Sequence, residues 1–258
     1  MPPGPEPSDA AVEGDAIGGR RAVLEALRAR RPLRKILIGR TTRGGTIREI
    51  LQEARRQDVA VQFVDQRRLD ALLRTPHQGV VALGSARPLV GVEDVLAAAH
   101  SRHEPPLVLV LDGVEDPANL GAIIRTAEGA GVHGVIIPKH RAAGLTPAVA
   151  KTSAGALEYL PVAQVTNLVR ALDELKAAGL WVAGADPAAV DVYHHVRLLP
   201  PLALVMGGEG KGLSRLVREH CDILVQLPMR GRIASLNVAV ATGVLLYEVV
   251  RQMAAANP

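Results

Sequence analysis

The feature that most constrains the fold is a series of short, almost wholly apolar segments that alternate with amphipathic segments. The apolar segments start at Leu107, Gly134, Leu180, Leu202 and Ile223. Segments of this length and apolarity are typical of strands buried on both faces, as in parallel sheets covered by helices. We therefore expect residues 107–258 to form a doubly wound α/β domain with a parallel sheet, closed by a long apolar helix from about Ser235.

The first third of the chain carries a second, smaller series of the same kind. Strands are predicted to start at Lys35, Val59 and Gly79, and helices at Ala22, Thr46 and Arg68. This alternation predicts a small α/β domain over residues 17–86. Residues 1–16 are rich in Pro, Gly and acidic residues and are expected to form a disordered tail. Residues 87–106 have prolines near both ends and are interpreted as a linker containing one short helix.

The distribution of charge separates the two predicted domains. The formal net charge is +4, and residues 1–104 hold all of the excess. Between Arg20 and Arg43, nine basic residues accompany one acid, Glu25. A solvated helix face would explain this cluster, and so would a surface that contacts RNA phosphates. On the second interpretation, the candidate RNA-binding residues are Arg20, Arg21, Arg30, Arg31 and Arg34.

Composition excludes several classes of protein. The single cysteine, Cys221, excludes an internal disulfide framework and a cysteine-based metal site, and it suits a reducing cytoplasm. Aromatic residues make up only 2% of the chain, which disfavours an RNA-binding sheet that stacks bases on several exposed rings. The histidine pairs lack carboxylates at ligand spacing, so we expect no metal. No apolar run approaches the roughly 20 residues of a membrane span, and the N-terminus lacks the pattern of a secretory signal, so we expect no membrane association and a cytoplasmic location.

Three loops of unusual composition follow strands of the second domain. They are residues 112–126, 207–214 and 227–237. The middle loop, GGEGKGLS, fails both the dinucleotide fingerprint and the Walker pattern, because Leu213 and Val205 stand where each requires glycine. A tight strand-to-helix turn with Ser214 as N-cap would explain it, and so would a backbone cradle for a ligand. In parallel sheets, ligands bind beyond the carboxyl ends of the strands, where all three loops are expected.

Two positions in these loops have simple structural explanations that we also keep. Asn119 is a plausible N-cap of a helix that extends to about Gly129, and Ser235 is a plausible N-cap of the last helix. Arg125 lies among Gly121, Ala122, Ile123 and Ile124, so the helix is predicted to be mostly buried. A buried arginine needs an anionic partner, for which a phosphate ligand and the Glu209 carboxylate are both candidates.

Taken together, the three loops resemble the motifs of a known family. The motifs are Asn119-x-Gly121-x-x-x-Arg125, Gly207-x-Glu209-x-x-Gly212 and Pro228-Met229-x-Gly231-x-x-x-Ser235-Leu236-Asn237-Val238. In order and spacing they resemble the SpoU/TrmH methyltransferases of the SPOUT superfamily. Gly18–Leu27 and His77–Val80 resemble the RNA-binding domain that precedes the catalytic domain in the bacterial 23S rRNA guanosine 2′-O-methyltransferase (RlmB) group. Ala239 departs from the Ser found in many relatives, and we expect little effect inside a helix.

The resemblance implies a fold, a cofactor and a set of site residues. It implies that the C-terminal segment forms a deep trefoil knot, which sequence patterns alone would never suggest. It implies an S-adenosylmethionine pocket made largely of backbone groups of Gly207, Leu227 and Leu236, with Met206, Gly208, Glu209 and Met229 nearby. It implies catalytic roles for Arg125, Asn119, Glu209, Ser235 and Asn237, with Arg125 acting as an electrostatic clamp because a guanidinium is a poor general base.

The resemblance also implies the substrate and the assembly. The expected reaction is 2′-O-methylation of a ribose in RNA, with a guanosine of 23S rRNA as the first candidate. Alternatives are tRNA, an rRNA adenosine as in antibiotic-resistance relatives, and a non-catalytic ribosome-assembly factor that binds RNA. We expect a homodimer, because relatives are dimers and the last helix, with Val240, Val244 and Leu245, is too apolar for one buried face.

Overall fold

The computed structural model describes residues 16–73, 76–84, 90–210 and 212–256. The predicted disordered tail therefore lies outside the described residues, except for Ala16. The chain divides into two compact units. The N-terminal unit comprises Met1–Arg87 and Leu145–Glu158, and the C-terminal unit comprises Pro88–Gly144 and Tyr159–Pro258.

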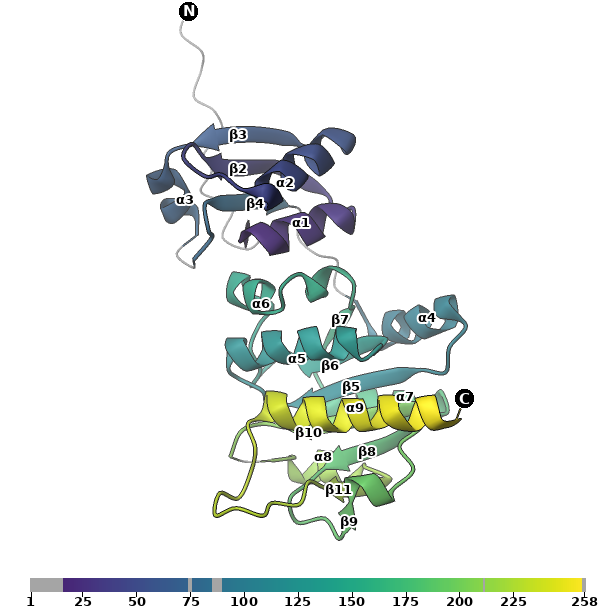
Figure 1. Cartoon of the computed structure of the whole chain (residues 1–258). Coiled ribbons are helices and arrows are strands. Elements are labelled where there is room, and N and C mark those ends of the chain that lie inside the picture. The colour runs from purple at the N-terminus through teal and green to yellow at the C-terminus, as the bar shows by residue number, and fades with distance from the viewer. Residues whose placement is uncertain (1–15, 74–75, 85–89, 211, 257–258) are drawn as a thin grey trace, which may run out of the picture. The chain divides into compact units, whose positions relative to one another are not determined.

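The N-terminal unit is built on a mixed four-stranded sheet in the order β1-β4-β2-β3 (Figure 1). Its elements are β1 (Ala16–Gly18), α1 (Arg20–Arg28), β2 (Leu33–Gly39), α2 (Gly45–Arg56), β3 (Ala60–Val64), α3 (Gln66–Leu72) and β4 (Val80–Gly84). Strands β2 and β3 are parallel, whereas β4 is antiparallel to both β1 and β2. The predicted strands and helices are all present. The three-residue β1 was not predicted, because it is too short to show a period.

Alternating side chains of the small sheet form two apolar layers. Ile36 and Ile38 of β2 pack with α1 and α2 on one face, and Leu37 packs with Leu69 of α3 on the other. The period-2 alternation of β2 thus places successive side chains on opposite faces, as expected for a strand covered on both sides. Strand β3 pairs only with β2 and forms an edge of the sheet.

The segment Leu145–Glu158 belongs to the N-terminal unit although it follows β6 of the other unit. It contains α6 (Pro147–Thr152) and the short 3₁₀ helix η2 (Ala156–Glu158). Arg31 Nη1 lies 3.2 Å from Glu158 Oε1, and the two side chains are only 12% and 5% exposed. The sequence assigned this whole region to the second domain. The structure differs because a buried ion pair and close packing of Gly155 on Glu25 attach it to α1.

The C-terminal unit is built on a seven-stranded sheet in the order β7-β6-β5-β10-β8-β11-β9, in which all neighbouring strands are parallel. Its strands are β5 (Leu107–Asp112), β6 (Gly134–Pro138), β7 (Val162–Val165), β8 (Trp181–Ala185), β9 (Asp191–Val192), β10 (Leu202–Gly207) and β11 (Ile223–Gln226). The five apolar runs became β5, β6, β8, β10 and β11, so the predicted parallel sheet is confirmed.

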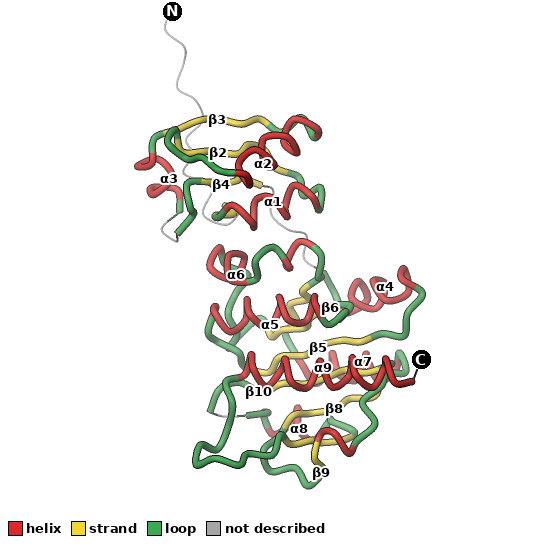
Figure 2. The backbone as a smooth tube through the Cα atoms, viewed as in Figure 1, coloured by secondary structure: helices red, strands yellow, loops and turns green. Residues whose placement is uncertain are grey.

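Helices cover both faces of the large sheet (Figure 2). They are α4 (Val92–Arg102), α5 (Pro117–Gly129), α7 (Leu168–Ala177), α8 (Arg215–Glu219) and α9 (Val238–Ala256), with the 3₁₀ helix η3 (Tyr193–His195). Helices α4, α7 and α8 share one apolar core with alternate residues of the central strands, such as Val108 and Val205. The predicted linker contains α4, which packs on β6 and β7 within this unit rather than standing apart.

Helices α5 and α9 pack side by side in the C-terminal unit (Figure 1). The methyl group of Thr126 approaches Gly243, and Gly129 faces the Tyr247 hydroxyl. Among the described residues, α9 is the one helix long and apolar enough, by length and composition, to cross a membrane. This finding departs from our expectation that no segment would reach that length. Core helices of globular proteins have the same composition, and α9 packs against α5 and β10.

Candidate active site

The glycine-rich loop after β10 is folded tightly against the end of β5. Gly208 N donates to Asp112 O at 2.7 Å, and Ser214 N donates to Asp112 Oδ2 at 2.6 Å. A Cβ on Gly207 would overlap the main chain of Gly212, and one on Gly208 would overlap the Gly113 carbonyl. Glycine is therefore required at both positions by close backbone approach. The loop is more than the simple turn that one interpretation of the sequence allowed, although Ser214 does stand at the N-cap position of α8.

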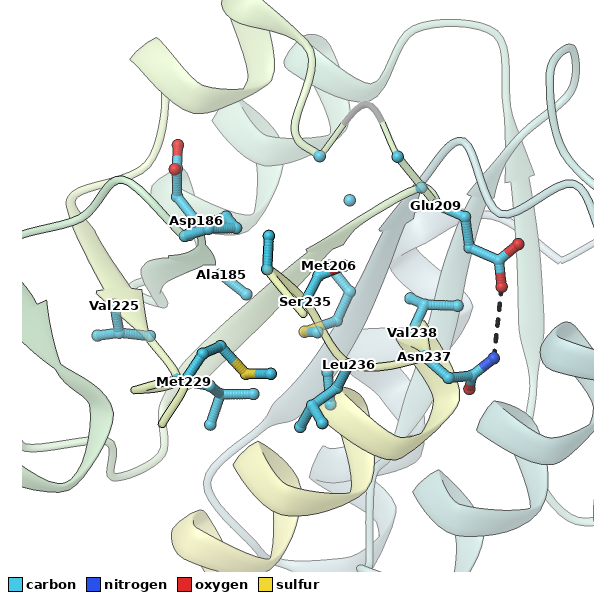
Figure 3. A pocket seen from close by; sticks show the side chains of 18 residues that line it. Ala185, Asp186, Met206, Glu209, Val225, Met229, Ser235, Leu236, Asn237 and Val238 are labelled. Atoms are coloured by element: carbon cyan, nitrogen blue, oxygen red, sulfur yellow. Dashed lines mark hydrogen bonds between the residues drawn. The ribbon is translucent and has the colours of Figure 1, made fainter. Parts of the chain in front are cut away.

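A cavity of about 510 Å³ lies beside this loop, at the carboxyl ends of the central strands (Figure 3). It is lined by every residue proposed for the cofactor pocket: Met206, Gly207, Gly208, Leu227, Met229 and Leu236. Glu209, Ser235 and Asn237 also line it. The volume and the mostly apolar lining match those of pockets that bind small organic ligands.

Three polar side chains from distant parts of the chain meet at the rim of this cavity. Asn119 Nδ2 donates to Glu209 Oε1, and Asn237 Nδ2 donates to Asn119 Oδ1 at 3.0 Å. Asn237 Nδ2 also lies 3.5 Å from Glu209 Oε1, and Figure 3 shows these two side chains pointing toward one another. Glu209 Oε1 accepts from both amides, whereas Oε2 has no hydrogen bond to any described residue and, because Glu209 is exposed, is open to solvent. The three side chains form a continuous chain of hydrogen bonds across three loops.

The predicted N-cap role of Asn119 is wrong. Helix α5 begins at Pro117, and its N-cap is Asp116, three residues before Asn119. The Asp116 carboxylate accepts from the main-chain nitrogens of Ala118 and Asn119, at 3.1 and 3.2 Å. Aspartate is as good an N-cap as asparagine, and proline is favoured at the first helical position. Asn119 consequently lies inside the first turn, where its amide is free to reach Glu209.

The prediction of a buried Arg125 is also wrong. Arg125 is exposed on α5, and it makes no hydrogen bond or ion pair with a described residue. Its six-residue separation from Asn119 corresponds to about 9 Å of rise and a rotation of about 240°, so the two side chains lie on different helix faces. Glu209 therefore bonds Asn119 and not Arg125. The free guanidinium faces solvent, where an anion could approach it.

The predicted N-cap role of Ser235 is wrong as well. Helix α9 starts at Val238, and Asn237 Oδ1 accepts from Ala239 N at 2.9 Å and from Val240 N at 3.3 Å. Asn237 is thus the N-cap of α9, and its amide group remains free to donate to Asn119. Ser235 is exposed and lines the cavity one residue before Leu236.

Sequence reasoning missed one wall of the cavity. Ala185, Asp186 and Pro187, which follow β8, line it opposite the glycine-rich loop. Asp186 is ion-paired with Arg218 of α8, and its Oδ1 accepts from Ala188 N at 2.7 Å. The available signal was that this segment directly follows a predicted apolar strand, so it had to lie at the ligand-binding edge of the sheet.

A second cavity of about 590 Å³ adjoins the first across the glycine-rich loop. Gly208, Glu209 and Gly212 line both cavities. The second is bounded on its far side by polar residues that follow β5, β6 and β7, among them Asp116, Arg141 and Asn167. Glu209 therefore stands between an apolar compartment and a polar compartment.

The predicted RNA-binding arginines occupy different environments in the N-terminal unit. Arg21, Arg30 and Arg34 are exposed. Arg20 donates from Nε to Gln78 O at 3.1 Å and from Nη1 to Arg43 O at 3.2 Å, so it supports two loops. Arg31 is mostly covered in its pair with Glu158, and only 12% of its side chain is exposed.

Two further observations concern reactive groups. In the part of the chain that the structure describes, no group of three His, Cys, Asp or Glu side chains could hold a metal ion. Burial raises the pKa of the Cys221 thiol to about 12, so this thiol is protonated at neutral pH and is a poor nucleophile.

Comparison with known proteins assigns the two regions. Residues 106–247 match the SpoU rRNA methylase family, and residues 16–90 match the RNA 2′-O ribose methyltransferase substrate binding domain. This pair of matches places the protein among the enzymes that methylate RNA. Since the first match covers more than half of the sequence, the chain belongs to the SpoU rRNA methylase family, in agreement with its resemblance to SpoU/TrmH enzymes.

Similar proteins span nearly the whole chain. A Bacillus subtilis protein, YacO, assigned to the TrmH family of tRNA/rRNA methyltransferases, is 46% identical over 92% of this chain and 96% of its own length. The SpoU methyltransferase AviRb from Streptomyces viridochromogenes, solved with its cofactor AdoMet, is 30% identical, covers 93% of this chain and 91% of its own, and superposes with a TM-score of 0.79. An AdoMet-bound rRNA methyltransferase from Sinorhizobium meliloti is 25% identical, covers 93% and 87% of the two chains, and has a TM-score of 0.75.

Proposed function

We propose that the protein transfers the methyl group of S-adenosylmethionine to the ribose 2′-hydroxyl of a guanosine in 23S rRNA. The observation that carries this proposal is the hydrogen-bond chain of Asn119, Glu209 and Asn237 at the boundary of two cavities. It sets one fixed carboxylate between a compartment suited to an apolar ring system and a compartment suited to a polar nucleotide.

The apolar cavity fits S-adenosylmethionine. Met206, Leu227 and Leu236 offer apolar surface for an adenine ring, and the glycine-rich loop offers main-chain groups without side chains to block them. Gly212 has a φ of 64°, and a Cβ there would point into open space. S-adenosylmethionine supplies an electrophilic methyl group when bound, and two structures of similar proteins contain it.

The polar groups would prepare the ribose hydroxyl for attack. A 2′-hydroxyl is a weak nucleophile while it is protonated, so the site has to orient it and stabilise the developing negative charge. The solvent-directed oxygen of Glu209 can accept a hydrogen bond from a ribose hydroxyl in the polar cavity. Asn119 and Asn237 hold that carboxylate in place, because each amide donates to it or to its neighbour. Ser235 would orient the substrate or the third loop.

Arg125 would act as an electrostatic clamp on an RNA phosphate. Its guanidinium has no carboxylate partner among the described residues, so no intramolecular ion pair has to break before it binds an anion. We expect Arg125→Ala to keep the fold and the affinity for S-adenosylmethionine but to slow methyl transfer by about 10²–10³-fold. Arg125→Lys should rescue only part of the rate, because an ammonium lacks the planar fork of the guanidinium. A rate within a few-fold of the parent would refute the clamp.

We further propose the assembly and topology that the resemblance implies, namely a homodimer and a deep trefoil knot. The dimer is supported by an exposed apolar stripe on α9, where Val240, Val244 and Tyr247 are 54%, 36% and 55% exposed. Their spacing places them on one helix face. Sedimentation should show a dimer at micromolar concentration, and Val244→Arg should produce monomers. We also propose a cytoplasmic location, where the lone Cys221 stays reduced.

The decisive experiment measures the reaction and locates its product. The purified protein is incubated with radiolabelled S-adenosylmethionine and with either total rRNA or total tRNA, and labelled nucleosides are then mapped. Label in a 2′-O-methylguanosine of 23S rRNA is expected. Label in tRNA, or in an rRNA adenosine, would replace the substrate in this proposal. RNA binding without any methyl transfer would favour the non-catalytic ribosome-assembly factor.

A further inference from the structure

The N-terminal unit contains a cavity of its own that the proposed chemistry does not use. It has a volume of about 640 Å³ and lies between β3, α2 and the loop that joins β2 to α2. Its apolar floor consists of Ile47 and Leu51 of α2 and Phe63 of β3. Its rim carries three guanidinium groups, those of Arg40, Arg43 and Arg48. An apolar floor inside a cationic rim is an unusual combination for a solvated surface.

The floor presents the only phenylalanine of the chain to solvent. Phe63 is 48% exposed, although a large aromatic ring is normally buried in a core. It lies on the edge strand β3 in parallel register with Ile38, which is fully buried beneath α1 and α2. Phe63 therefore lies on the same face of the sheet as Ile38. Helices α1 and α2 bury Ile38 but leave Phe63 partly exposed. The ring is held by the sheet and open on one side.

The cationic rim is held in place and is not neutralised. Arg43 Nη1 donates to the carbonyls of Arg40 and Thr42 at 2.6 and 3.0 Å, and Arg20 donates to the Arg43 carbonyl. These bonds fix the loop through its own backbone. Neither Arg43 nor Arg48 forms an ion pair with a described carboxylate. Arg40 has a single acidic neighbour, Asp65, with 3.5 Å between Nε and Oδ1, and both side chains are well exposed.

We propose that this cavity, the Phe63 pocket, binds one unpaired nucleotide of the RNA substrate. The base stacks on the Phe63 ring beside Ile47 and Leu51, and the arginines of the rim hold the flanking phosphates. Stacking on aromatic rings next to arginine is how proteins recognise unpaired bases, and it needs only one exposed ring. The low aromatic content argued against a sheet that stacks several bases, but it permits a single stacking position.

This inference rests on the proposed function, since it takes RNA as the substrate, and it adds where and in what form the RNA is held. A paired base could not enter, because its faces are already stacked within the duplex. The Phe63 pocket therefore selects a loop, bulge or strand end. Contact with duplex backbone alone would need the arginines but not the ring, and this difference makes the proposal testable.

The test compares the full-length protein with variants at Phe63. Binding of an unstructured ten-nucleotide RNA, and of a duplex of equal length, is measured at several salt concentrations. Phe63→Leu keeps an apolar side chain and removes the stacking surface, so we expect a loss of about tenfold in affinity for the single strand and little change for the duplex. Phe63→Trp should keep or improve single-strand binding. Equal single-strand affinity of Phe63→Leu and the parent would overturn the proposal.

Arg48 provides the matched test of the rim. Arg48→Gln should reduce the slope of log affinity against log salt by about 1. Arg67→Gln is the control, because Arg67 is exposed on α3, which covers the opposite face of the sheet, and has no ion pair with any residue that the structure describes. A loss of binding in Arg48→Gln together with none in Phe63→Leu would show backbone contact only, and would also overturn the stacking proposal.

Photo-crosslinking locates the base directly. The same ten-nucleotide RNA carrying 5-iodouridine should crosslink to Phe63, and the crosslink should disappear in Phe63→Leu. Crosslinks confined to other peptides would contradict the pocket. Methyl transfer and cofactor binding by the parent are measured in parallel. A parent that binds RNA at Phe63 without transferring methyl groups would refute the proposed function while leaving the Phe63 pocket intact.

Discussion

The two candidate ligand sites are assembled from the chain in opposite ways. The apolar cavity of the C-terminal unit is lined by segments that follow three parallel strands, β8, β10 and β11. At its rim, the Asn119–Glu209 contact joins residues 90 positions apart. The Phe63 pocket is formed by residues 40–63 alone. The first site exists only when the whole parallel sheet is folded, whereas the second depends on one strand, one loop and one helix.

The two sites also differ in the sign of the charge that they present. A carboxylate held by two amides dominates the first site. Three guanidinium groups dominate the second, and of these only Arg40 has an ion-pair partner among the described residues. Chemistry at a reacting hydroxyl requires a group fixed within a fraction of an ångström, which a rigid sheet edge supplies. Attraction of a polyanion tolerates looser placement. On the proposed function, precise placement of the reacting groups and affinity for RNA are supplied by separate parts of the molecule.

The largest loss of stability should come from removing the Arg31–Glu158 ion pair, which joins two distant segments of the N-terminal unit. Glu158→Ala would leave the Arg31 guanidinium buried without its partner, and Arg31 Nε already lacks a hydrogen bond. Removing one member of a buried ion pair costs about 3–5 kcal/mol of folding free energy. Hydrogen exchange should show weaker protection in residues 17–84, with cofactor binding retained. Arg28→Ala, which removes exposed pairs with Glu25 and Glu49, should cost about 1 kcal/mol or less. Equal effects of the two variants would contradict the role of the 145–158 segment.

The next largest effect concerns Glu209 and tests whether the rate of methyl transfer and the affinity for RNA depend on different sites. Glu209→Ala should lower the single-turnover rate of methyl transfer by about 10²–10³-fold, equivalent to about 2.7–4 kcal/mol, with unchanged RNA affinity. Glu209→Gln should fall between Ala and the parent, because the amide keeps an acceptor oxygen for Asn119 but loses the charge. If RNA affinity falls in step with the rate, the two sites are not functionally separate.

Asn237 allows the structural and functional roles of one residue to be measured apart. Asn237→Ala should cost about 1 kcal/mol of folding free energy through loss of the N-cap of α9. Asn237→Ser should restore the cap, since serine is a good N-cap, but it cannot donate an amide hydrogen to Asn119. We therefore expect urea unfolding to distinguish the two variants and methyl-transfer rates to be low in both. Full activity in Asn237→Ser would show that capping is the only role.

The smallest effect is expected from the exposed arginines of the N-terminal unit. Substituting Arg21, Arg30 or Arg34 singly by Gln should reduce the salt slope of rRNA binding by at most about 1 and leave cofactor affinity unchanged. A salt titration of binding to 23S rRNA measures this change. Substitutions at all three that leave the slope unaltered would assign RNA binding to the Phe63 pocket and exclude this surface.

The sequence predicted the parallel sheet well because buried parallel strands leave an unmistakable pattern of apolar runs. The family resemblance implied six residues that line the cavity, but neither it nor the strand pattern identified the wall formed by Ala185, Asp186 and Pro187. The sequence predictions were wrong where the position of a residue depended on residues that pack against it in the fold. Asp116 and Asn119 are both good caps, and only the helix start decides between them. Arg125 was predicted to be buried from its apolar neighbours, but α5 buries only the faces that meet the sheet and α9.

Longer-range features left no local signal. Nothing in the composition of residues 145–158 distinguishes them from the loops around them, and their attachment to α1 depends on Arg31, more than a hundred residues earlier. The exposed position of Phe63 is likewise a property of the edge of a sheet, which the sequence of β3 does not record.

The position of Asn237 has a consequence for how this enzyme can change over evolution. The Asn237 side chain caps the last helix with its oxygen and, with its nitrogen, joins the hydrogen-bond chain of Asn119 and Glu209. A replacement for Asn237 therefore has to accept hydrogen bonds from the start of α9 and also donate one to Asn119. Serine and aspartate can cap the helix, but neither offers an amide donor. The Phe63 pocket carries no such double constraint, because none of its lining residues caps a helix of the C-terminal unit.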